Sequence, residues 1–314
     1  MTLNRRSFLV GGAASAAASI STFAHAANPC STPTTWDKTY DIIVIGSGGA
    51  GLSAGIVAKE KGANAVVLEK LSIPGGNTMV SGGGLNAAVE ADYKKAGIED
   101  SPQLHTKQTM AAGDYRADPA LVATLCENVP QSVEWLKKVG VQFKPGIYQI
   151  YGGLWPRCRN PVGQSGGDYI KACMNYANKI GLPVLTNHKV VGIIREKPDS
   201  GRVLGVELKD GKKEFWKANK AVVAAAGGFA ANPTMCSYFD PRLTKLNTTN
   251  QPGSTGEVLK CIQGIGGLAV GLDYIQCIPW TAPGYKHTAD IFQAIEYTIF
   301  LNKEGKRYVA RRNS

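Results

Sequence analysis

The chain has 314 residues and a mass of 33.3 kDa; 44% of its residues are hydrophobic and 19% are charged. This size and composition exclude an intrinsically disordered protein and a small disulfide scaffold, and no apolar run is long enough to span a bilayer. The formal charge is +11, but the basic residues are scattered and lack interleaved aromatic residues, so no nucleic-acid partner is expected. Two explanations of the charge remain: it attracts an anionic small-molecule substrate, or it keeps the protein soluble.

The first 26 residues have the pattern of an export signal. Arg5 and Arg6 precede a stretch rich in Val, Gly, Ala and Ser that ends at the small-residue site Ala24-His25-Ala26. This order predicts a twin-arginine signal peptide over residues 1–26 and a periplasmic mature protein, which begins with a polar linker over residues 27–38. Because the twin-arginine pathway exports folded proteins, it also favours a bound cofactor.

The seven cysteines and four histidines form no recognisable site. The cysteines are irregularly spaced, without a Cys-x-x-Cys or Cys-x-x-Cys-His motif, so neither a disulfide framework nor a haem on this chain is expected. Most of the thiols should be buried apolar residues. The histidines lie far apart, without carboxylate or thiolate neighbours at ligand spacing, and no metal site is predicted.

A dinucleotide-binding motif follows the linker. The apolar, β-branched run at residues 40–45 predicts a strand, and residues 52–61 predict a helix. Between them lies G-x-G-x-x-G, in which Gly46 permits a tight turn, Gly48 lets the backbone approach a pyrophosphate, and Gly51 packs the helix against the strand.

A second predicted strand, residues 65–68, ends at Glu69. An acidic residue at this distance from the glycines can accept the ribose hydroxyls of a dinucleotide. A further glycine-rich passage over residues 73–78 and 81–88 suits backbone contact with a larger, extended cofactor, which favours FAD over NAD.

At this point the sequence resembles flavoprotein fumarate reductases of the soluble, exported flavocytochrome c type. The resemblance extends from about Asp41 to the end of the chain. Beyond the glycine motifs, it is carried by residues 98–102, 109–113, 118–122, 133–136, 225–229, 250–257, 274–276 and 302–309.

The motifs and the resemblance together predict a non-covalently bound FAD. The resemblance implies that Val190 touches the adenine side through its backbone, and that Glu257 lies beside the flavin, where the family usually has Asp. The candidate FAD-binding residues are Gly46, Gly48, Gly49, Ala50, Gly51, Glu69, Lys70, Gly76, Asn77, Thr78, Gly82, Gly83, Val190, Gly227, Gly228 and Glu257.

The predicted fold is α/β, with a Rossmann-like FAD-binding domain over residues 39–238. Residues 189–195 and 201–208 predict paired strands and an Asp-Gly turn follows, so a small β-sheet is expected to be inserted before the strand at residues 221–226. Residues 239–314 are expected to begin an α+β capping domain that is incomplete, since the resemblance implies a longer cap and a return segment.

The active site implied by the resemblance departs from the family pattern. The family's substrate-gripping His falls on Ile278, its Thr-Glu pair on Asp290-Ile291, and its next arginine on Ala294. Two interpretations remain open. Ile278, Trp280 and Tyr285 form an apolar substrate pocket, or they are ordinary core residues.

The last predicted element is a β-hairpin over residues 297–301 and 307–310. The family's proton-donating arginine aligns about one residue beyond Ser314. Arg312 takes that role if the register slips by three residues, with Asp290 as a second candidate catalytic group. Alternatively, Arg312 belongs to a solvated basic tail.

The resemblance implies an FAD-dependent reductase that acts on the C=C bond of an α,β-unsaturated carboxylate other than fumarate. Without a haem motif, the chain would need a separate cytochrome or a flavin-carrying protein as its electron donor. Two alternatives remain: a truncated, non-catalytic FAD-binding remnant or subunit, and a flavoenzyme similar to the ketosteroid dehydrogenases.

Overall fold

The computed structural model describes residues 32–150, 153–277, 299 and 301–307. The strands are β1 (Lys38–Ile45), β2 (Ala65–Leu68), β3 (Leu85–Asn86), β4 (Cys158–Arg159), β5 (Val184–Leu185), β6 (Val190–Arg195), β7 (Val203–Asp210) and β8 (Lys212–Ala224). The helices are α2 (Gly49–Glu60), α3 (Gly76–Val80), α4 (Glu90–Lys95), α5 (Pro102–Ala112), α6 (Pro119–Val139), α7 (Gly167–Lys179), α8 (Pro233–Ser237), the 3₁₀ helix η1 (Pro241–Lys245) and α9 (Glu257–Gly264).

A six-stranded sheet in the order β5-β2-β1-β8-β7-β6 forms the centre of the fold. Strands β5, β2, β1 and β8 run parallel to one another. Within β1, Val44 packs into the core formed with α2 and α7, whereas Ile43 and Ile45 pack into a second core on the other face. Because both faces are covered, β2 and the second half of β1 consist of consecutive apolar residues. The predicted Rossmann-like α/β fold is confirmed.

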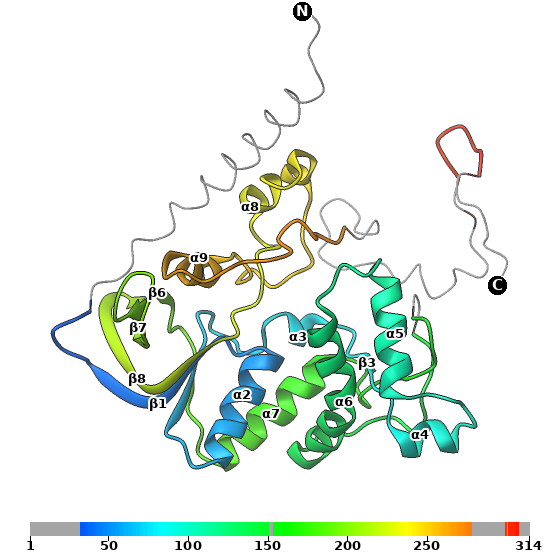
Figure 1. Cartoon of the computed structure of the whole chain (residues 1–314), viewed down its shortest axis with the longest axis horizontal. Coiled ribbons are helices and arrows are strands. Elements are labelled where there is room, and N and C mark those ends of the chain that lie inside the picture. Colours follow the sequence, from blue (N-terminus) through cyan, green and yellow to red (C-terminus); the bar gives the residue numbers. More distant parts are fainter. Residues whose placement is uncertain (1–31, 151–152, 278–298, 300, 308–314) are drawn as a thin grey trace, which may run out of the picture.

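The second core is formed with the antiparallel strands β6 and β7, and with α9. The expected strand pair is present, but it does not form a separate inserted sheet. Strand β8 pairs with β7 over its first residues and with β1 from Trp216 to Ala224, so the hairpin continues into the main sheet (Figure 1). One 13-residue strand thus begins at the turn and includes most of the strand expected at residues 221–226.

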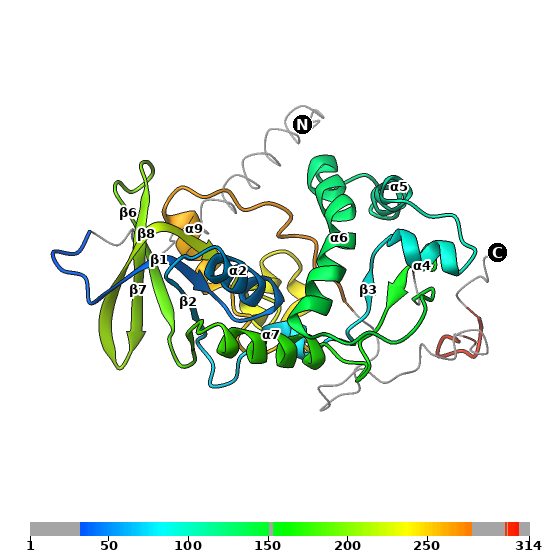
Figure 2. The same cartoon turned by 90° about the horizontal axis from the view of Figure 1, so that it is seen from below.

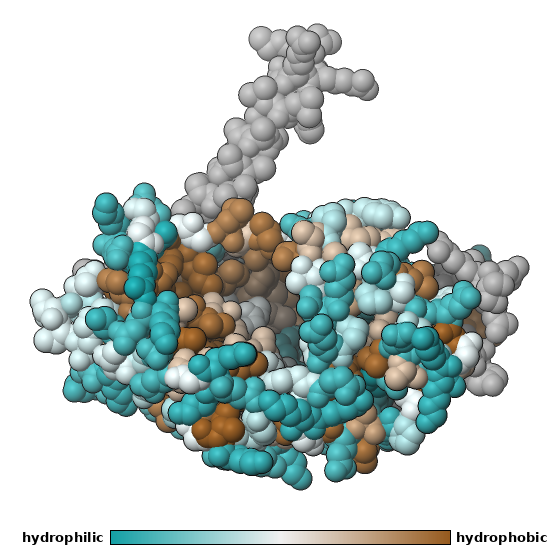
Figure 3. All heavy atoms as spheres, turned by 60° about the horizontal axis from the view of Figure 1, so that its bottom comes forward, coloured by the Kyte–Doolittle hydropathy of each residue, from teal (hydrophilic) through white to brown (hydrophobic). Residues whose placement is uncertain are grey.

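A helical part containing α4, α5 and α6 and the small β3–β4 sheet lies beside the main sheet (Figure 2). The Asp118 carboxylate caps α6 by accepting the backbone N–H groups of Ala120 and Leu121, and the helix ends at Gly140 with φ of 112°. Between the helical part and the sheet the surface is hollowed, and hydrophobic residues gather on the walls of the hollow (Figure 3).

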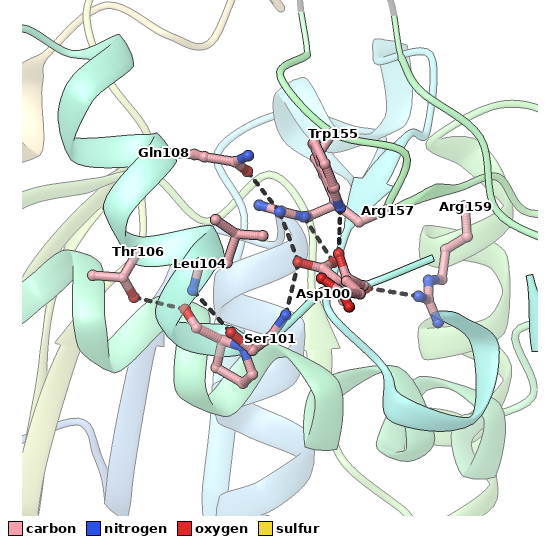
Figure 4. Close-up of polar contacts among 11 residues, drawn as sticks. Asp100, Ser101, Leu104, Thr106, Gln108, Trp155, Arg157 and Arg159 are labelled. Carbon is pink, nitrogen blue, oxygen red and sulfur yellow. Dashed lines mark hydrogen bonds and ion pairs between the residues drawn. The ribbon is translucent and has the colours of Figure 1, made fainter. Parts of the chain in front are cut away.

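A buried ion pair anchors the helical part (Figure 4). Arg157 donates to Asp100 from Nε at 3.0 Å and from Nη2 at 2.8 Å, and Nη2 also donates to Gln108 at 2.6 Å. Both charged side chains are at most 4% exposed. Nearby, burial and the charge of Arg157 lower the pKa of His105. The pair joins the residues before α5 to the segment that leads into β4.

The described cysteines are all free, and five of them are buried, as expected for apolar core residues. Among the described residues, no helix combines the length and hydropathy needed to cross a bilayer. In the same part of the chain, His, Cys, Asp and Glu side chains form no group of three that could hold a metal ion.

Candidate cofactor-binding site

A cavity of about 210 Å³ lies at the carboxyl ends of β1, β2 and β8. This is the edge at which parallel α/β sheets bind their ligands. The lining residues come from six parts of the chain. They are Ile45 to Ala50, Leu68 to Leu71, Gly76 to Thr78, His188, Val190, Ala225 to Gly227, Gln251, Gly253, Ser254 and Gly256 to Leu259.

The glycine-rich turn between β1 and α2 forms one wall of this cavity. Gly46 has φ of +99°, and a Cβ there would lie 2.5 Å from the Ala225 carbonyl oxygen. A Cβ on Gly51 would lie 1.9 Å from the Gly46 carbonyl oxygen, so only glycine lets α2 pack this closely. Helix α2 begins after Gly48, without a side-chain cap or an acidic residue in its first turn. Its N-terminus therefore presents backbone N–H groups and positive potential, which suit a pyrophosphate.

Glu69 is oriented by the same turn. Its Oε2 accepts the Ser47 backbone N–H at 3.1 Å and the Ser47 hydroxyl at 2.6 Å, while Oε1 accepts the Leu71 backbone N–H at 2.9 Å. Ser47 in turn accepts the Gly75 backbone N–H at 3.0 Å. A carboxylate held this way at the end of β2 fits the ribose-binding role predicted for it.

Glu257, the first residue of α9, lines the cavity together with Lys70 and is paired with two lysines. Lys70 Nζ lies 2.8 Å and Lys189 Nζ 3.2 Å from its carboxylate. Burial raises the pKa of Glu257, but hydrogen bonds from Lys70, Thr255 and Lys189 outweigh burial and lower this pKa to about 2. The carboxylate is therefore charged at neutral pH, and it ties α9 to the end of β2 and to the start of β6.

Asn77 connects the second glycine-rich passage to the late part of the chain. Its Nδ2 donates to Asn250 Oδ1 at 2.7 Å and to Ser254 Oγ at 3.1 Å, and its Oδ1 accepts the Gln251 backbone N–H at 2.7 Å. The neighbouring Thr78 hydroxyl accepts the Gly49 backbone N–H at 3.0 Å. Residues about 170 positions apart thus meet at one cavity wall.

Four of the predicted cofactor residues do not line this cavity. Gly51 is buried beneath the turn, and Gly82 is exposed. Gly83 packs against the backbone of Ser165, where a Cβ would approach to 2.7 Å, and Gly228 lines a second cavity. The predicted residues that do line the first cavity are Gly46, Gly48, Gly49, Ala50, Glu69, Lys70, Gly76, Asn77, Thr78, Val190, Gly227 and Glu257.

The lining residues that were not predicted include three with polar side chains, Ser47, His188 and Ser254. Ser47 occupies a variable position of the glycine motif, so the motif gave no signal for it. Ser254 lies within residues 250–257, which carry part of the resemblance, but its contact with Asn77 depends on tertiary structure. His188 was not predicted, although Val190, two residues later, was expected to contact the adenine side.

A second cavity, of about 680 Å³, is lined by residues that are adjacent in sequence to residues of the first. Gly228 follows Gly227, and Asn250 precedes Gln251. Its walls include the apolar residues Phe229, Leu243 and Ile275, and Lys245 supplies a cation. The predicted substrate and catalytic residues Ile278, Trp280, Tyr285, Asp290 and Arg312 lie outside the described residues. Of the predicted C-terminal hairpin, the described part shows an antiparallel bridge between Leu301 and Arg307.

These residues fit a bound FAD. A glycine cradle without side chains, a helix N-terminus and an oriented carboxylate provide the groups that a dinucleotide needs. Residues 41–314 match the family described as FAD binding domain.

Two curated relatives are named for reactions on unsaturated acids. The chain is 34% identical to the fumarate reductase (cytochrome) of Shewanella frigidimarina, over 86% of this chain and 48% of that protein. It is 31% identical to the acrylate reductase flavoprotein subunit of Shewanella woodyi, over 98% of this chain and 63% of that protein. The chain therefore spans about half to three fifths of the length of these relatives.

Two solved structures are similar in fold. One is the open conformation of a flavocytochrome c3 fumarate reductase, with a TM-score of 0.67 and 29% identity over 73% of this chain and 41% of that chain. The other is a 3-ketosteroid-Δ4-(5α)-dehydrogenase from Rhodococcus jostii RHA1. Its TM-score is 0.68, with 29% identity over 76% of this chain and 56% of that chain.

Proposed function

Because the chain belongs to the FAD binding domain family and has fumarate reductase flavoproteins among its relatives, we propose that it is an FAD-dependent reductase of α,β-unsaturated carboxylates. The observation that carries this proposal is the pairing of two cavities. One cavity is lined by glycines and by the oriented Glu69. The other is larger, has apolar walls and one lysine, and is lined by residues adjacent in sequence to those of the first.

The first cavity would hold the cofactor non-covalently. The turn at Gly46, Gly48 and Gly49 would bind the pyrophosphate, and Glu69 would bind the ribose. The protein backbone at Gly227 would line the path toward the isoalloxazine ring. Reduced FAD, when bound, supplies the hydride that is added to the β-carbon of the unsaturated acid.

The second cavity would hold the substrate. Lys245 would attract the carboxylate, and Phe229 and Ile275 would exclude water from the reacting double bond. We assign Ile278, Trp280 and Tyr285 to the same apolar wall, and Arg312 or Asp290 to the proton transfer to the α-carbon. An apolar wall favours alkyl or aryl acrylates over fumarate, which carries a second carboxylate. The name of the acrylate reductase relative agrees with this preference.

The export pattern at residues 1–26, together with the cofactor site, supports a periplasmic protein. Its electrons would come from a separate cytochrome or a flavin-carrying protein, because the cysteines of this chain include no haem-attachment motif.

A ketosteroid dehydrogenase activity is the second candidate function. It is favoured by the similarity to the Rhodococcus jostii structure and by the apolar lining of the second cavity. In that reaction the substrate reduces the flavin, so the direction of electron transfer separates the two candidates. A third possibility, a non-catalytic FAD-binding protein, predicts bound flavin that reacts with neither class of substrate.

The test is anaerobic flavin absorbance of the purified chain. After reduction with dithionite, alkyl and aryl acrylates should reoxidise the flavin faster than fumarate does. If fumarate is the best acceptor, the proposed substrate preference is wrong. Bleaching of oxidised flavin by a 3-ketosteroid would support the second candidate, and a chain that binds no FAD would contradict both. Lys245→Met should slow reoxidation by the anionic acids, whereas Lys212→Met, at the β7–β8 turn, serves as the control.

A further inference from the structure

His188 occupies a distinctive place in the first cavity. It lies between β5 and β6, lines the cavity beside Val190, and donates its backbone N–H to the Glu69 carbonyl at 2.8 Å. Glu69 thus contacts the glycine-rich turn through its side chain and His188 through its backbone. A base attached to a ribose bound at Glu69 would therefore lie near His188 and Val190.

The imidazole ring of His188 is fixed from two sides. Its Nδ1 lies 2.7 Å from the Thr186 carbonyl oxygen, which can only accept a hydrogen bond, so Nδ1 carries the proton. The ring also meets Trp216 edge-on, with 5.6 Å between centroids and 62° between planes. Trp216 is itself fully buried, stacked on Tyr40 and covered by Lys38 Nζ at 4.2 Å. The ring is held in place before any ligand binds.

With the proton on Nδ1, the neutral ring has Nε2 as a hydrogen-bond acceptor. Nε2 has no hydrogen-bond partner among the described residues. Lys70, which lines the cavity, and Lys189, which lies between His188 and Val190 in the sequence, are both paired with Glu257. His188 therefore provides an acceptor that is fixed, unpartnered and located where the base is expected.

We propose that His188 selects adenine as the base of the dinucleotide, by accepting a hydrogen bond from the exocyclic amine at Nε2. A base with a carbonyl at that position, such as hypoxanthine, would place two acceptors against each other and would bind more weakly. This inference rests on the proposed binding of FAD. It adds a base-reading residue that the glycine motif does not supply.

The test compares ADP and IDP, which differ only in the base, as competitors of FAD for the flavin-free chain at about pH 8. Calorimetric titration should show ADP binding about 10-fold more tightly than IDP. In His188→Phe, which keeps an aromatic ring against Trp216, the ratio should fall to about one. Lys189→Met is the matched control, because loss of the neighbouring charge should weaken both nucleotides equally and leave their ratio unchanged.

A second measurement does not depend on a variant. In nitrogen NMR spectra of the wild-type imidazole, ADP should shift the Nε2 resonance of His188 and IDP should not. The inference is overturned if the wild type binds ADP and IDP equally, if folded His188→Phe keeps the preference, or if Nε2 does not respond to ADP. If neither nucleotide competes with FAD, the assignment of the first cavity to the adenine end fails, and with it this part of the proposed function. Reoxidation of the flavin by enoates is measured separately, so the two failures are distinguishable.

Discussion

The hydroxyl of Ser47 donates a 2.6 Å hydrogen bond to the carboxylate of Glu69, although the two residues lie 22 positions apart. This bond joins the glycine-rich turn after β1 to the end of β2. The turn and the acidic residue are therefore connected directly, so the groups proposed to bind the phosphates and the ribose are held together before a ligand binds.

The close approach of α2 to the turn gives the first prediction. In Gly51→Ala the new Cβ would overlap the Gly46 carbonyl oxygen, so the helix must move away from the turn. We expect FAD affinity to fall at least about 10-fold, and the free energy of unfolding to fall by about 1–3 kcal/mol. Flavin fluorescence titration and urea denaturation measure the two effects. Gly113→Ala is the control, because its φ is −92° and its Cβ would come no closer than 3.5 Å to another atom. Equal affinities in the two variants would contradict the packing argument.

The buried pair of Asp100 and Arg157 gives the second prediction. Arg157→Met leaves a carboxylate that is 0% exposed without its cation, and we expect a loss of about 3–5 kcal/mol in the free energy of unfolding. The double variant Asp100→Leu/Arg157→Met should be more stable than Arg157→Met alone, because no unpaired charge remains. Lys138→Met, which breaks the exposed pair with Glu60, should cost less than about 1 kcal/mol. Urea denaturation of the four proteins tests this order, and a loss no larger in Arg157→Met than in Lys138→Met would refute it.

The parts of the site that the sequence predicted are those that are local in the chain. The strand, the glycine turn, the helix and Glu69 lie within 30 residues, and each leaves a pattern in composition and spacing. Their positions at one sheet edge follow from the topology of parallel strands. The resemblance extended the prediction to Val190, Gly227 and Glu257, all of which line the first cavity.

What the sequence did not predict depends on contacts between distant segments. The pairing of Lys70 with Glu257 spans 187 positions, and no periodicity reports it. The sequence analysis did not predict that β8 is one continuous strand. The part that pairs with β7 and the part that pairs with β1 follow each other directly, and the alternation of their side chains does not show where one pairing ends and the other begins. Position 83 is a glycine because the chain packs closely against Ser165 there. The sequence does not distinguish such a packing glycine from one that contacts a ligand.

The ion pair of Lys70 and Glu257 gives the third prediction, a dependence of stability on pH. The pKa of Glu257 in the folded protein is about 2, below its ordinary value of 4.5, so the charged form favours folding. Its contribution is fully present above the ordinary value and is lost as the pH falls toward about 2. The difference in unfolding free energy between the wild type and Glu257→Gln should therefore be largest near neutral pH and shrink below about pH 4.5.

Thermal and urea denaturation over this pH range measure that difference. Asp240 also has a pKa lowered to about 2 by Arg242, but it is present in both proteins and cancels in the comparison. If the difference in unfolding free energy stays constant from neutral to acid pH, the lysines do not stabilise the charged form of Glu257 in the folded protein.

The bond between Ser47 and Glu69 gives the last prediction. Ser47→Ala removes the shortest of the contacts that orient the carboxylate and leaves the Gly75 backbone N–H without its acceptor, at a site that is 0% exposed. The Ser47 backbone N–H still donates to Glu69, so the turn should remain folded while the carboxylate gains freedom. We expect FAD affinity to fall about 10-fold and the free energy of unfolding to fall by about 1–3 kcal/mol. Ser81→Ala, which removes an exposed hydroxyl bonded to Thr78, should change neither quantity by a comparable amount. Because FMN has no adenosine ribose, its affinity should be unaffected by Ser47→Ala; an equal loss of FMN and FAD binding would show that the bond supports the whole turn and not the ribose-binding carboxylate.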